Sequence, residues 1–514
     1  MSKVLALRGL WPFNLALLAG LGPLVVFSLN LNRMMVETLV IGIAILFAIL
    51  LVLRFALVLA VRHPAWTDPL LVLVVLAGFY NSFFASDSGT PAFWLWLAIF
   101  ILPIVLVAVS PRARAVLPKV TLVFLAIVNV LVLVDVVQYE GWSRRAELRA
   151  MLDAHYPPLA AGGTGVVTDR PDIYYLVFDR YARADQLAVV YEFDNSGFID
   201  ALRARGFQVS DGAYGAYQRT AHSLGSTLNL DYLPALDGVP SNDWVPLYER
   251  LRAPRLYGFL TSEGYRIVTM GSWWEPTRTS GLADSSISYF AVPESLRAMV
   301  EGSALLRGLD GLGLDWLDPR RRQCERIKYK FEALADLGSD DRPVFAFAHF
   351  LVPHPPFVID ADGRCKSVDE TRALSRRDNY IAQLRYANGA ILDLIDGLIA
   401  RDPEAVIVLQ SDEGPWPERY AGDEITDFGG DVTSVDWRTV PPDELREKIA
   451  ILAAMRLPGR PSAVIADDFS PVNTFRIILR EYFGQPLPDL EPRTWVFEND
   501  ASLWRYRDVG DDLR

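Results

Sequence analysis

Acidic residues follow two apolar stretches of the chain, and their chemistry suits a divalent metal ion. Asp179 comes directly after the apolar run 173–178. A similar run in 405–414, AVIVLQSDEG, ends on Asp412 and Glu413. Both runs are short and lack a helical period, which predicts strands buried on both faces, as in a parallel sheet. Open α/β sheets bind ligands at the carboxyl ends of such strands, so we expect these three acids to hold a metal.

Carboxylate ligands do not specify which metal binds. Manganese, magnesium and calcium fit an all-oxygen site as well as zinc does. The alternative for Asp412 and Glu413 is that two adjacent acids at a strand end simply form a solvated turn. The rigid sequence Gly-Pro-Trp-Pro that follows them favours a built site.

Thr220 is the candidate nucleophile. It opens the sequence TAHSLGSTLNLDYL, which predicts a helix with Thr220 at or near its N-cap. The free N–H groups and the positive dipole end at a helix start suit an anion such as phosphate. A metal held nearby would lower the pKa of the threonine hydroxyl and polarise a phosphoryl oxygen. The alternative is that Thr220 only caps the helix.

Two histidines, His349 and His354, lie at the end of a predicted strand that runs into a proline-rich loop, PVFAFAHFLVPHPPFV. Either side chain suits the binding of a substrate phosphate or the protonation of a leaving group near neutral pH. The alternative is a structural role. The sequence leaves two roles for His222, which either faces the site or caps its helix.

The first part of the chain contains almost all of the long apolar runs. Each is long enough to cross a bilayer, which takes about 20 residues. Basic residues such as Arg62 and Lys119 lie in alternate loops, so the positive-inside rule places the N-terminus in the cytoplasm. The five predicted spans are 10–30, 36–60, 69–86, 92–110 and 117–138.

Five crossings would put everything after the last span outside the cytoplasm. We expect a transmembrane domain over 1–139, a linker over 140–170 and a catalytic domain over 171–514. The only two cysteines of the chain, Cys324 and Cys365, both fall in that outer part and are expected to form a disulfide. The net charge of -12 argues against nucleic acid as a partner.

Predicted strands and helices alternate in the outer part, which indicates an α/β fold with crossover connections. The strands are expected in 173–178, 264–271, the first part of 343–358, 405–412 and 448–459. The helices are expected in 195–205, near 220, in 245–263, around Cys324 to about 337, and in 371–400 and 471–484.

The order of these motifs resembles the alkaline phosphatase/sulfatase superfamily. It is a strand ending in aspartate, Thr-x-x-Ser opening a helix, H-x-x-x-P-H-x-P, and S-D-x-G after a strand. With five spans ahead of it, the layout is similar to lipoteichoic acid synthases and lipid A phosphoethanolamine transferases. The resemblance implies an α/β domain with a mostly parallel central sheet. It also implies that Asp179, Thr220 and Asp412 with Glu413 bind the metal, that Thr220 is the nucleophile, and that the histidines at 349–354 contact substrate.

The chain departs from the family pattern at two points. Glu413 stands where S-D-H-G has a histidine, which makes zinc less strongly indicated. The sulfatase signature C/S-x-P-x-R is absent, and Thr220 cannot become formylglycine, which argues against a true sulfatase.

The resulting hypothesis is a metal-dependent phosphotransferase or phosphodiesterase in the plasma membrane. Its substrates would be membrane lipids and cell-envelope glycans outside the cytoplasm. A sulfatase-like ester hydrolase that uses water, and an inactive protein that binds the envelope, are the alternatives.

Overall fold

The structure is a computed structural model in which the chain forms two compact units. One unit contains the described residues of Met1–Ser143 and Val292–Pro319, and the other contains those of Arg144–Ala291 and Arg320–Arg514. The residues that the structure describes are 11–61, 71–72, 105, 110–160, 170–235, 241–289, 292, 296, 318–338, 342–423, 435–460 and 465–513.

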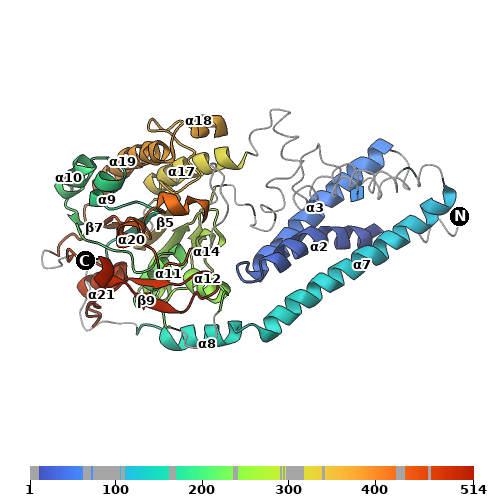
Figure 1. Cartoon of the computed structure of the whole chain (residues 1–514), viewed down its shortest axis with the longest axis horizontal. Helices are drawn as coiled ribbons and strands as arrows, with labels where there is room; N and C mark the ends of the chain where they lie inside the picture. The colour runs from blue at the N-terminus through green and yellow to red at the C-terminus, as the bar shows by residue number, and fades with distance from the viewer. Residues whose placement is uncertain are drawn as a thin grey trace. The chain divides into compact units, whose positions relative to one another are not determined.

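The first unit contains three long apolar helices (Figure 1). They are α2 (Trp11–Leu29), α3 (Val36–Val61) and α7 (Pro111–Trp142). Each is long and apolar enough to cross a membrane. The predicted spans 69–86 and 92–110 lie almost entirely outside the described residues. Three of the five predicted spans are therefore seen as helices.

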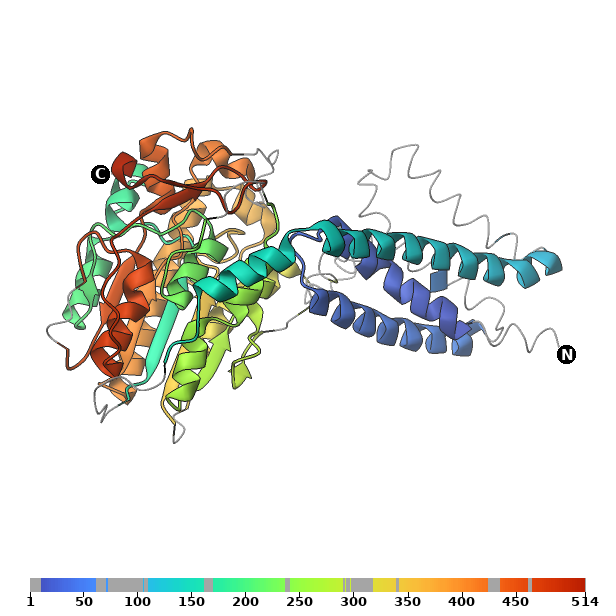
Figure 2. The ribbon, with the colours of Figure 1, turned by 90° about the horizontal axis from the view of Figure 1, so that it is seen from below.

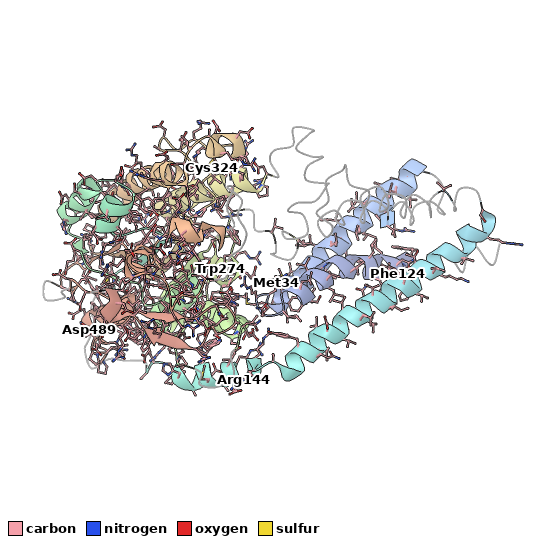
Figure 3. All side chains as sticks on the ribbon, viewed as in Figure 1. Met34, Phe124, Arg144, Trp274, Cys324 and Asp489 are labelled. Atoms are coloured by element: carbon pink, nitrogen blue, oxygen red, sulfur yellow. A yellow bond between two sulfur atoms is a disulfide. The ribbon has the colours of Figure 1, made fainter. Side chains whose placement is uncertain are left out.

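The outer surfaces of these helices are apolar, as expected for contact with lipid. Phe124 on α7 is 60% exposed and is labelled in Figure 3, and Phe55 on α3 is 66% exposed. The helices also contact one another through a polar group, because the Asn129 amide on α7 donates a hydrogen bond to the Leu17 carbonyl on α2 at 3.1 Å. Water would make so much exposed apolar surface unfavourable, whereas a bilayer does not.

A seven-stranded sheet forms the centre of the second unit (Figure 2). Its strand order is β2-β7-β6-β1-β5-β3-β4. Strands β6, β1, β5, β3 and β4 are parallel, and β7 is antiparallel to both of its neighbours. A separate antiparallel pair is formed by β8 and β9. The strands are β1 (Ile173–Phe178), β2 (Gln208–Val209), β3 (Arg266–Met270), β4 (Ser285–Ser286), β5 (Val344–Phe350), β6 (Val406–Gln410), β7 (Ala453–Arg456), β8 (Trp495–Phe497) and β9 (Tyr506–Asp508).

Helices cover both faces of the sheet, which is why β1 is buried along its whole length. Alternate side chains of β1 enter two different cores. Helices α9, α10, α17 and α19 pack on one face, and α11, α12, α13 and α21 pack on the other (Figure 1). The helices are α8 (Arg145–His155), α9 (Ala184–Val190), α10 (Ser196–Ala204), α11 (Thr220–Asn229), α12 (Val245–Arg252), α13 (Arg255–Ser262), α14 (Glu275–Arg278), α17 (Pro319–Ala335), α18 (Val368–Arg372), α19 (Arg376–Arg401), α20 (Pro442–Ile449), α21 (Thr474–Phe483) and α22 (Gly510–Leu513).

The α/β fold with a mostly parallel sheet agrees with the sequence analysis, but two elements differ from it. The helix predicted over 245–263 is two helices, α12 and α13, because Pro254 lies between them in an extended conformation. The strand predicted over 448–459 is shorter and follows helix α20. That helix begins at Pro442 with two acidic residues in its first turn, both of which favour a helix start.

The predicted linker 140–170 contains a further helix, α8, which packs against α12 in the second unit. The guanidinium of Arg145 lies 2.8 Å from the Asp243 carboxylate, and both side chains are 2% exposed. A second ion pair joins Arg149 to Glu249 at 2.6 Å. This part of the linker is therefore bound to the second unit rather than extended.

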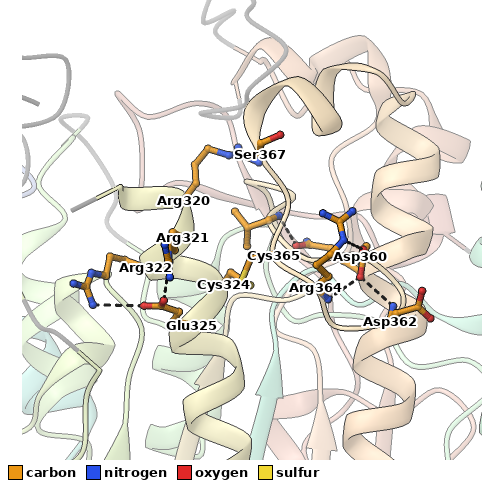
Figure 4. The surroundings of a disulfide bond; sticks show 12 residues. Arg320, Arg321, Arg322, Cys324, Glu325, Asp360, Asp362, Arg364, Cys365 and Ser367 are labelled. Atoms are coloured by element: carbon orange, nitrogen blue, oxygen red, sulfur yellow. Dashed lines mark hydrogen bonds and ion pairs between the residues drawn. A yellow bond between two sulfur atoms is a disulfide. The ribbon is translucent and has the colours of Figure 1, made fainter. Parts of the chain in front are cut away.

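The predicted disulfide between Cys324 and Cys365 is confirmed, with the two α-carbons 5.7 Å apart. The bond joins α17 to the loop 351–367 that follows β5. Figure 4 shows the ion pair between Arg364 and Asp360 beside Cys365. The disulfide thus anchors the far end of the loop that carries His354.

Replacing both cysteines by alanine should lower the free energy of unfolding by about 4 kcal/mol, because the bond joins residues 41 positions apart and restricts the unfolded chain. The measurement is urea unfolding of the full chain in detergent, followed by tryptophan fluorescence. Dithiothreitol should shift the wild-type midpoint and leave that of the double variant unchanged. Equal midpoints for wild type and variant would contradict the prediction.

Candidate active site

Three neighbouring parallel strands bring one chemically active side chain each to the same edge of the sheet. Strand β1 lies between β5 and β6, and Val177 on β1 is level with both His349 and Gln410. Asp179 directly follows β1, and Asp412 lies two residues after β6. The carboxyl ends of parallel strands meet at one edge, so residues far apart in sequence converge there.

Asp179, His349 and Asp412 form a group that could hold a metal ion. One ligand atom from each residue lies within 4.8 Å of the other two. His349 Nε2 is 3.3 Å from Asp179 Oδ2. All three side chains are buried, with residue exposures of 2% or less.

The group also leaves polar atoms without partners, which is unusual in a protein interior. Asp179 Oδ1, His349 Nε2 and both carboxylate oxygens of Asp412 have no hydrogen-bond partner among the described residues. A buried polar atom without a partner destabilises the fold. A divalent cation would satisfy all of them at once, so these residues fit a bound metal.

Electrostatics supports the same conclusion. Burial and the charge of Glu413 raise the pKa of Asp179, and burial and the charge of Asp179 raise the pKa of Asp412. Burial lowers the pKa of His349 to about 4, so the imidazole is neutral. A cation bound between them would favour the two ionised carboxylates and use the free lone pair of the imidazole.

A hydroxyl fixes the orientation of the His349 ring. Thr277 Oγ1 on α14 lies 3.0 Å from His349 Nδ1, which leaves Nε2 directed towards Asp179. The chain can bring α14 this close because Gly271 has no side chain. A Cβ atom at that position would lie 1.8 Å from the Thr277 carbonyl oxygen. Outer partners of this kind set the tautomer and ring orientation of histidines that bind metals.

Glu413, which we expected to be a ligand, points to two cations instead of joining the group of three. Its Oε1 is 2.6 Å from Lys448 Nζ and 3.3 Å from Arg180 Nε. Although burial acts to raise the pKa of Glu413, the charges of Lys448 and Arg180 lower it. His349, rather than Glu413, is the third member of the group that could hold a metal ion.

Thr220 lies beside the group and is less deeply buried. It is the first residue of α11, and the N-cap residue is Arg219, so Thr220 does not hold the capping position that the alternative interpretation required. Its hydroxyl interacts with the Asp412 carboxyl and acts to lower the pKa of that group, against the larger effect of burial. Thr220 itself is half-buried. Thr220 therefore lies beside the candidate ligands and is partly exposed.

The remaining histidines have different surroundings. His354 is half-buried, and its Nδ1 contacts the Pro355 carbonyl. Burial, followed by the charge of Arg180, lowers the pKa of His354. His222 is fully buried among aromatic rings, its Nε2 lies 3.0 Å from the Leu503 carbonyl, and burial lowers its pKa to about 3. These contacts favour a structural role for His222.

The sulfatase family model matches residues 171–436, which is more than half of the 514 residues. The chain belongs to the sulfatase family. The matched region includes Asp179, Thr220, His349 and Asp412, whereas Lys448 lies beyond it. No curated protein sequence matches the chain.

Solved structures that the chain resembles include a periplasmic domain and an integral membrane protein. The C-terminal periplasmic domain of EptC from Escherichia coli, in complex with zinc, is 12% identical, with a TM-score of 0.43; the match covers 68% of this chain and 96% of that one. The integral membrane protein EptA from Neisseria meningitidis, a lipooligosaccharide phosphoethanolamine transferase, is 15% identical, with a TM-score of 0.40. That match covers 91% of this chain and 95% of EptA.

For this member of the sulfatase family, three residues of the site were missed by the sequence analysis. Arg180 directly follows Asp179, and Lys448 closely precedes β7, but neither belongs to a recognisable motif. Thr277 lies in a stretch for which the sequence analysis predicted neither a strand nor a helix. One signal in the sequence pointed to the two cations, namely Glu413. A second buried acid, where the family pattern has a histidine, needs a nearby cation to offset its charge.

Replacing Thr277 by valine should weaken metal binding by roughly 10- to 100-fold, because the ring of His349 loses the partner that orients it. Metal affinity would be measured by competition with a chelator, using the full chain in detergent. Thr277→Ser keeps the hydroxyl and should bind metal like wild type. Equal affinities for the valine and serine variants would contradict a positioning role for Thr277.

Proposed function

We propose that the protein is a membrane-anchored, metal-dependent transferase that uses Thr220 to move a phosphoryl-alcohol group from a phospholipid to a cell-envelope lipid or glycan. The observation that supports this most directly is the group of Asp179, His349 and Asp412, whose ligand atoms lie within 4.8 Å of one another. The nearby hydroxyl of Thr220 adds a nucleophile to that group.

The residues of this group favour certain metals over others. Two carboxylates and one imidazole suit zinc or manganese better than calcium, which prefers oxygen ligands alone. A divalent ion held by Asp179, His349 and Asp412 would stabilise negative charge on the reacting oxygens and favour ionisation of the Thr220 hydroxyl.

Thr220 would act in two successive transfers. In the first, Thr220 Oγ attacks the phosphorus of the phospholipid, and the bond from phosphorus to the diacylglycerol oxygen breaks. The hydroxyl proton leaves Thr220, and the diacylglycerol oxygen takes up a proton, which balances the step. In the second, an acceptor hydroxyl loses its proton and attacks the same phosphorus, the bond from phosphorus to Thr220 Oγ breaks, and Thr220 Oγ regains a proton.

His354 is suited to accept the proton of the acceptor hydroxyl. Its Nδ1 contacts the Pro355 carbonyl, which holds the N–H on that nitrogen and leaves a lone pair on Nε2. Burial lowers the pKa of His354, so the ring is neutral and has a free lone pair, although it is a weaker base than an exposed histidine.

The apolar helices of the first unit would keep the domain beside its lipid donor. Three of them are long and apolar enough to cross a membrane, and tethering raises the effective concentration of a lipid substrate. The disulfide supports a location outside the cytoplasm, where such bonds persist.

Membership of the sulfatase family favours a second candidate, the hydrolysis of a sulfate or phosphate ester with water as acceptor. Both candidates use the same first step at Thr220. Product analysis separates them, because only the transferase forms a modified lipid or glycan acceptor.

Thr220→Ala should abolish turnover while the fold and the metal content remain, and Thr220→Ser should retain activity because the hydroxyl survives. The assay follows release of diacylglycerol from a fluorescent phospholipid by the full chain in detergent, with zinc, manganese, magnesium or calcium added in turn. Ser226→Ala is the matched control, since it removes a hydroxyl of the same helix that donates to the Ser223 carbonyl.

Ser226→Ala should be as active as wild type. A folded Thr220→Ala variant that turns over at the wild-type rate would rule out the covalent mechanism. Attack by water or by another side chain would then replace it.

A further inference from the structure

A pocket outside the candidate active site lies between the segment that precedes α21 and the last part of the chain. It has a volume of about 170 Å³ and is partly open to solvent. None of its lining residues belongs to the group that could hold a metal or takes part in the proposed transfers. The lining includes Tyr214, Asp468, Phe469, Ser470, Arg493 and Thr494.

Close contacts hold the backbone around this pocket in place. Ser210 Oγ donates a hydrogen bond to the Asp467 carbonyl at 2.7 Å, and a Cβ atom at Gly212 would lie 2.5 Å from the same oxygen. The Tyr214 hydroxyl donates to the Leu513 carbonyl at 3.0 Å. The pocket is therefore preformed, and a ligand would bind without the cost of ordering its walls.

The lining combines aromatic rings with hydroxyl groups and a carboxylate. Tyr214 and Phe469 supply the aromatic surface. Ser470 and Thr494 supply hydroxyls and are 2% and 4% exposed. Asp468 is exposed and adds the carboxylate. Sites for small molecules have this composition, in which apolar surface provides contact area and a few polar groups fix the orientation of the ligand.

The charges of the lining argue against an anion and against a lipid chain as the ligand. Arg493 supplies the positive charge, and its guanidinium lies 2.8 Å from the Glu491 carboxylate and 3.6 Å from that of Asp508. An anion would therefore meet a cation that is already paired, together with the carboxylate of Asp468. A lipid chain would bury the polar groups of the lining without partners, which is unfavourable. A neutral molecule with many hydroxyl groups satisfies both constraints.

A short stretch of chain joins the pocket to the candidate nucleophile. Tyr214 lies six residues before Thr220, and six residues of extended chain span at most about 20 Å. Between them, Gly215 packs on the backbone of Asp412, where a Cβ atom would lie 3.3 Å from the carbonyl oxygen. Thr494 Oγ1 donates to the Gly215 carbonyl at 3.2 Å. An extended ligand with one end in the pocket would therefore reach the active site.

We propose that this pocket binds a neutral sugar ring of the glycan acceptor. The apolar face of the ring lies against Tyr214 and Phe469. The sugar hydroxyls donate to the Asp468 carboxylate and exchange hydrogen bonds with Ser470 and Thr494. The proposal rests on the proposed function, since it specifies the acceptor whose hydroxyl attacks in the second transfer.

The test measures sugar binding to the full chain by saturation-transfer NMR titration, in a detergent without a sugar head group and without a phospholipid donor. The neutral probes are glucose, galactose and N-acetylglucosamine. At least one of them should bind more tightly than glycerol, which has hydroxyls but no ring face, and more tightly than glucuronate, whose charge is repelled by Asp468. Absence of binding by all three sugars, or tighter binding of glycerol or glucuronate, would overturn the proposal.

Asp468→Ala should weaken binding of the tightest of these sugars about tenfold, because a charged hydrogen-bond acceptor is lost. Asp468 is exposed, so the variant should remain folded. Asp467→Ala is the matched control, since Asp467 is the neighbouring exposed acid, does not line the pocket and contacts Ser210 through its backbone carbonyl. It should bind the sugar like wild type, and equal weakening by the two variants would overturn the assignment of the pocket.

The sugar pocket and the proposed function fail separately in these experiments. The titrations contain no donor, so their outcome does not depend on whether Thr220 is the nucleophile. Failure of the sugars to bind would overturn the pocket and leave diacylglycerol release as the test of Thr220. An active Thr220→Ala variant would overturn the covalent mechanism and leave the difference between Asp468→Ala and Asp467→Ala as the test of the pocket.

Discussion

Two carboxylates buried side by side impose the main constraint on this protein. Asp179 and Asp412 lie at the ends of adjacent strands, and burial of both raises their pKa values. The stable solutions are protonation or a cation between them. The neutral imidazole of His349 in the same group favours the cation, because its Nε2 lone pair can bind a metal, whereas burial disfavours the charged imidazolium that would pair with a carboxylate.

Other parts of the domain hold the residues of the site in place. The parallel sheet fixes where the three residues meet, and Thr277 fixes the ring of His349. The disulfide joins α17 to the far end of the loop that carries His354. Glu413 pairs with Arg180 and Lys448, two cations that would otherwise repel a metal.

Local patterns predicted much of this fold. The strand over 173–178, the start of the helix at Thr220 and the disulfide are as expected, because each depends on nearby residues or on a single pair of cysteines. The pairing of β1 with both β5 and β6 depends on contacts across the whole chain. The sequence could predict that Asp179 and Asp412 meet at the strand ends. It could not predict that His349 joins them, because the direction of its Nε2 depends on Thr277, which lies in another element.

Glu413 shows the same limit at a single residue. Its type suits a metal ligand, and it stands at the position where the family pattern has a histidine. The side chain instead contacts Lys448, which lies at the end of α20. The sequence analysis had predicted that a strand, over 448–459, begins at this residue. A residue type predicts what a side chain can bind, whereas the choice between a metal and a lysine depends on the tertiary structure.

The most direct measurement of the central claim is an anomalous difference map from crystals of the full chain loaded with zinc or manganese. We predict a peak bound by Asp179, His349 and Asp412 at roughly 2.0–2.2 Å, beside the Thr220 hydroxyl. Glu413 should remain paired with Lys448 in the same crystals. A peak bound by Glu413 in place of His349, or a loaded protein without a peak at the ends of β1, β5 and β6, would contradict the account.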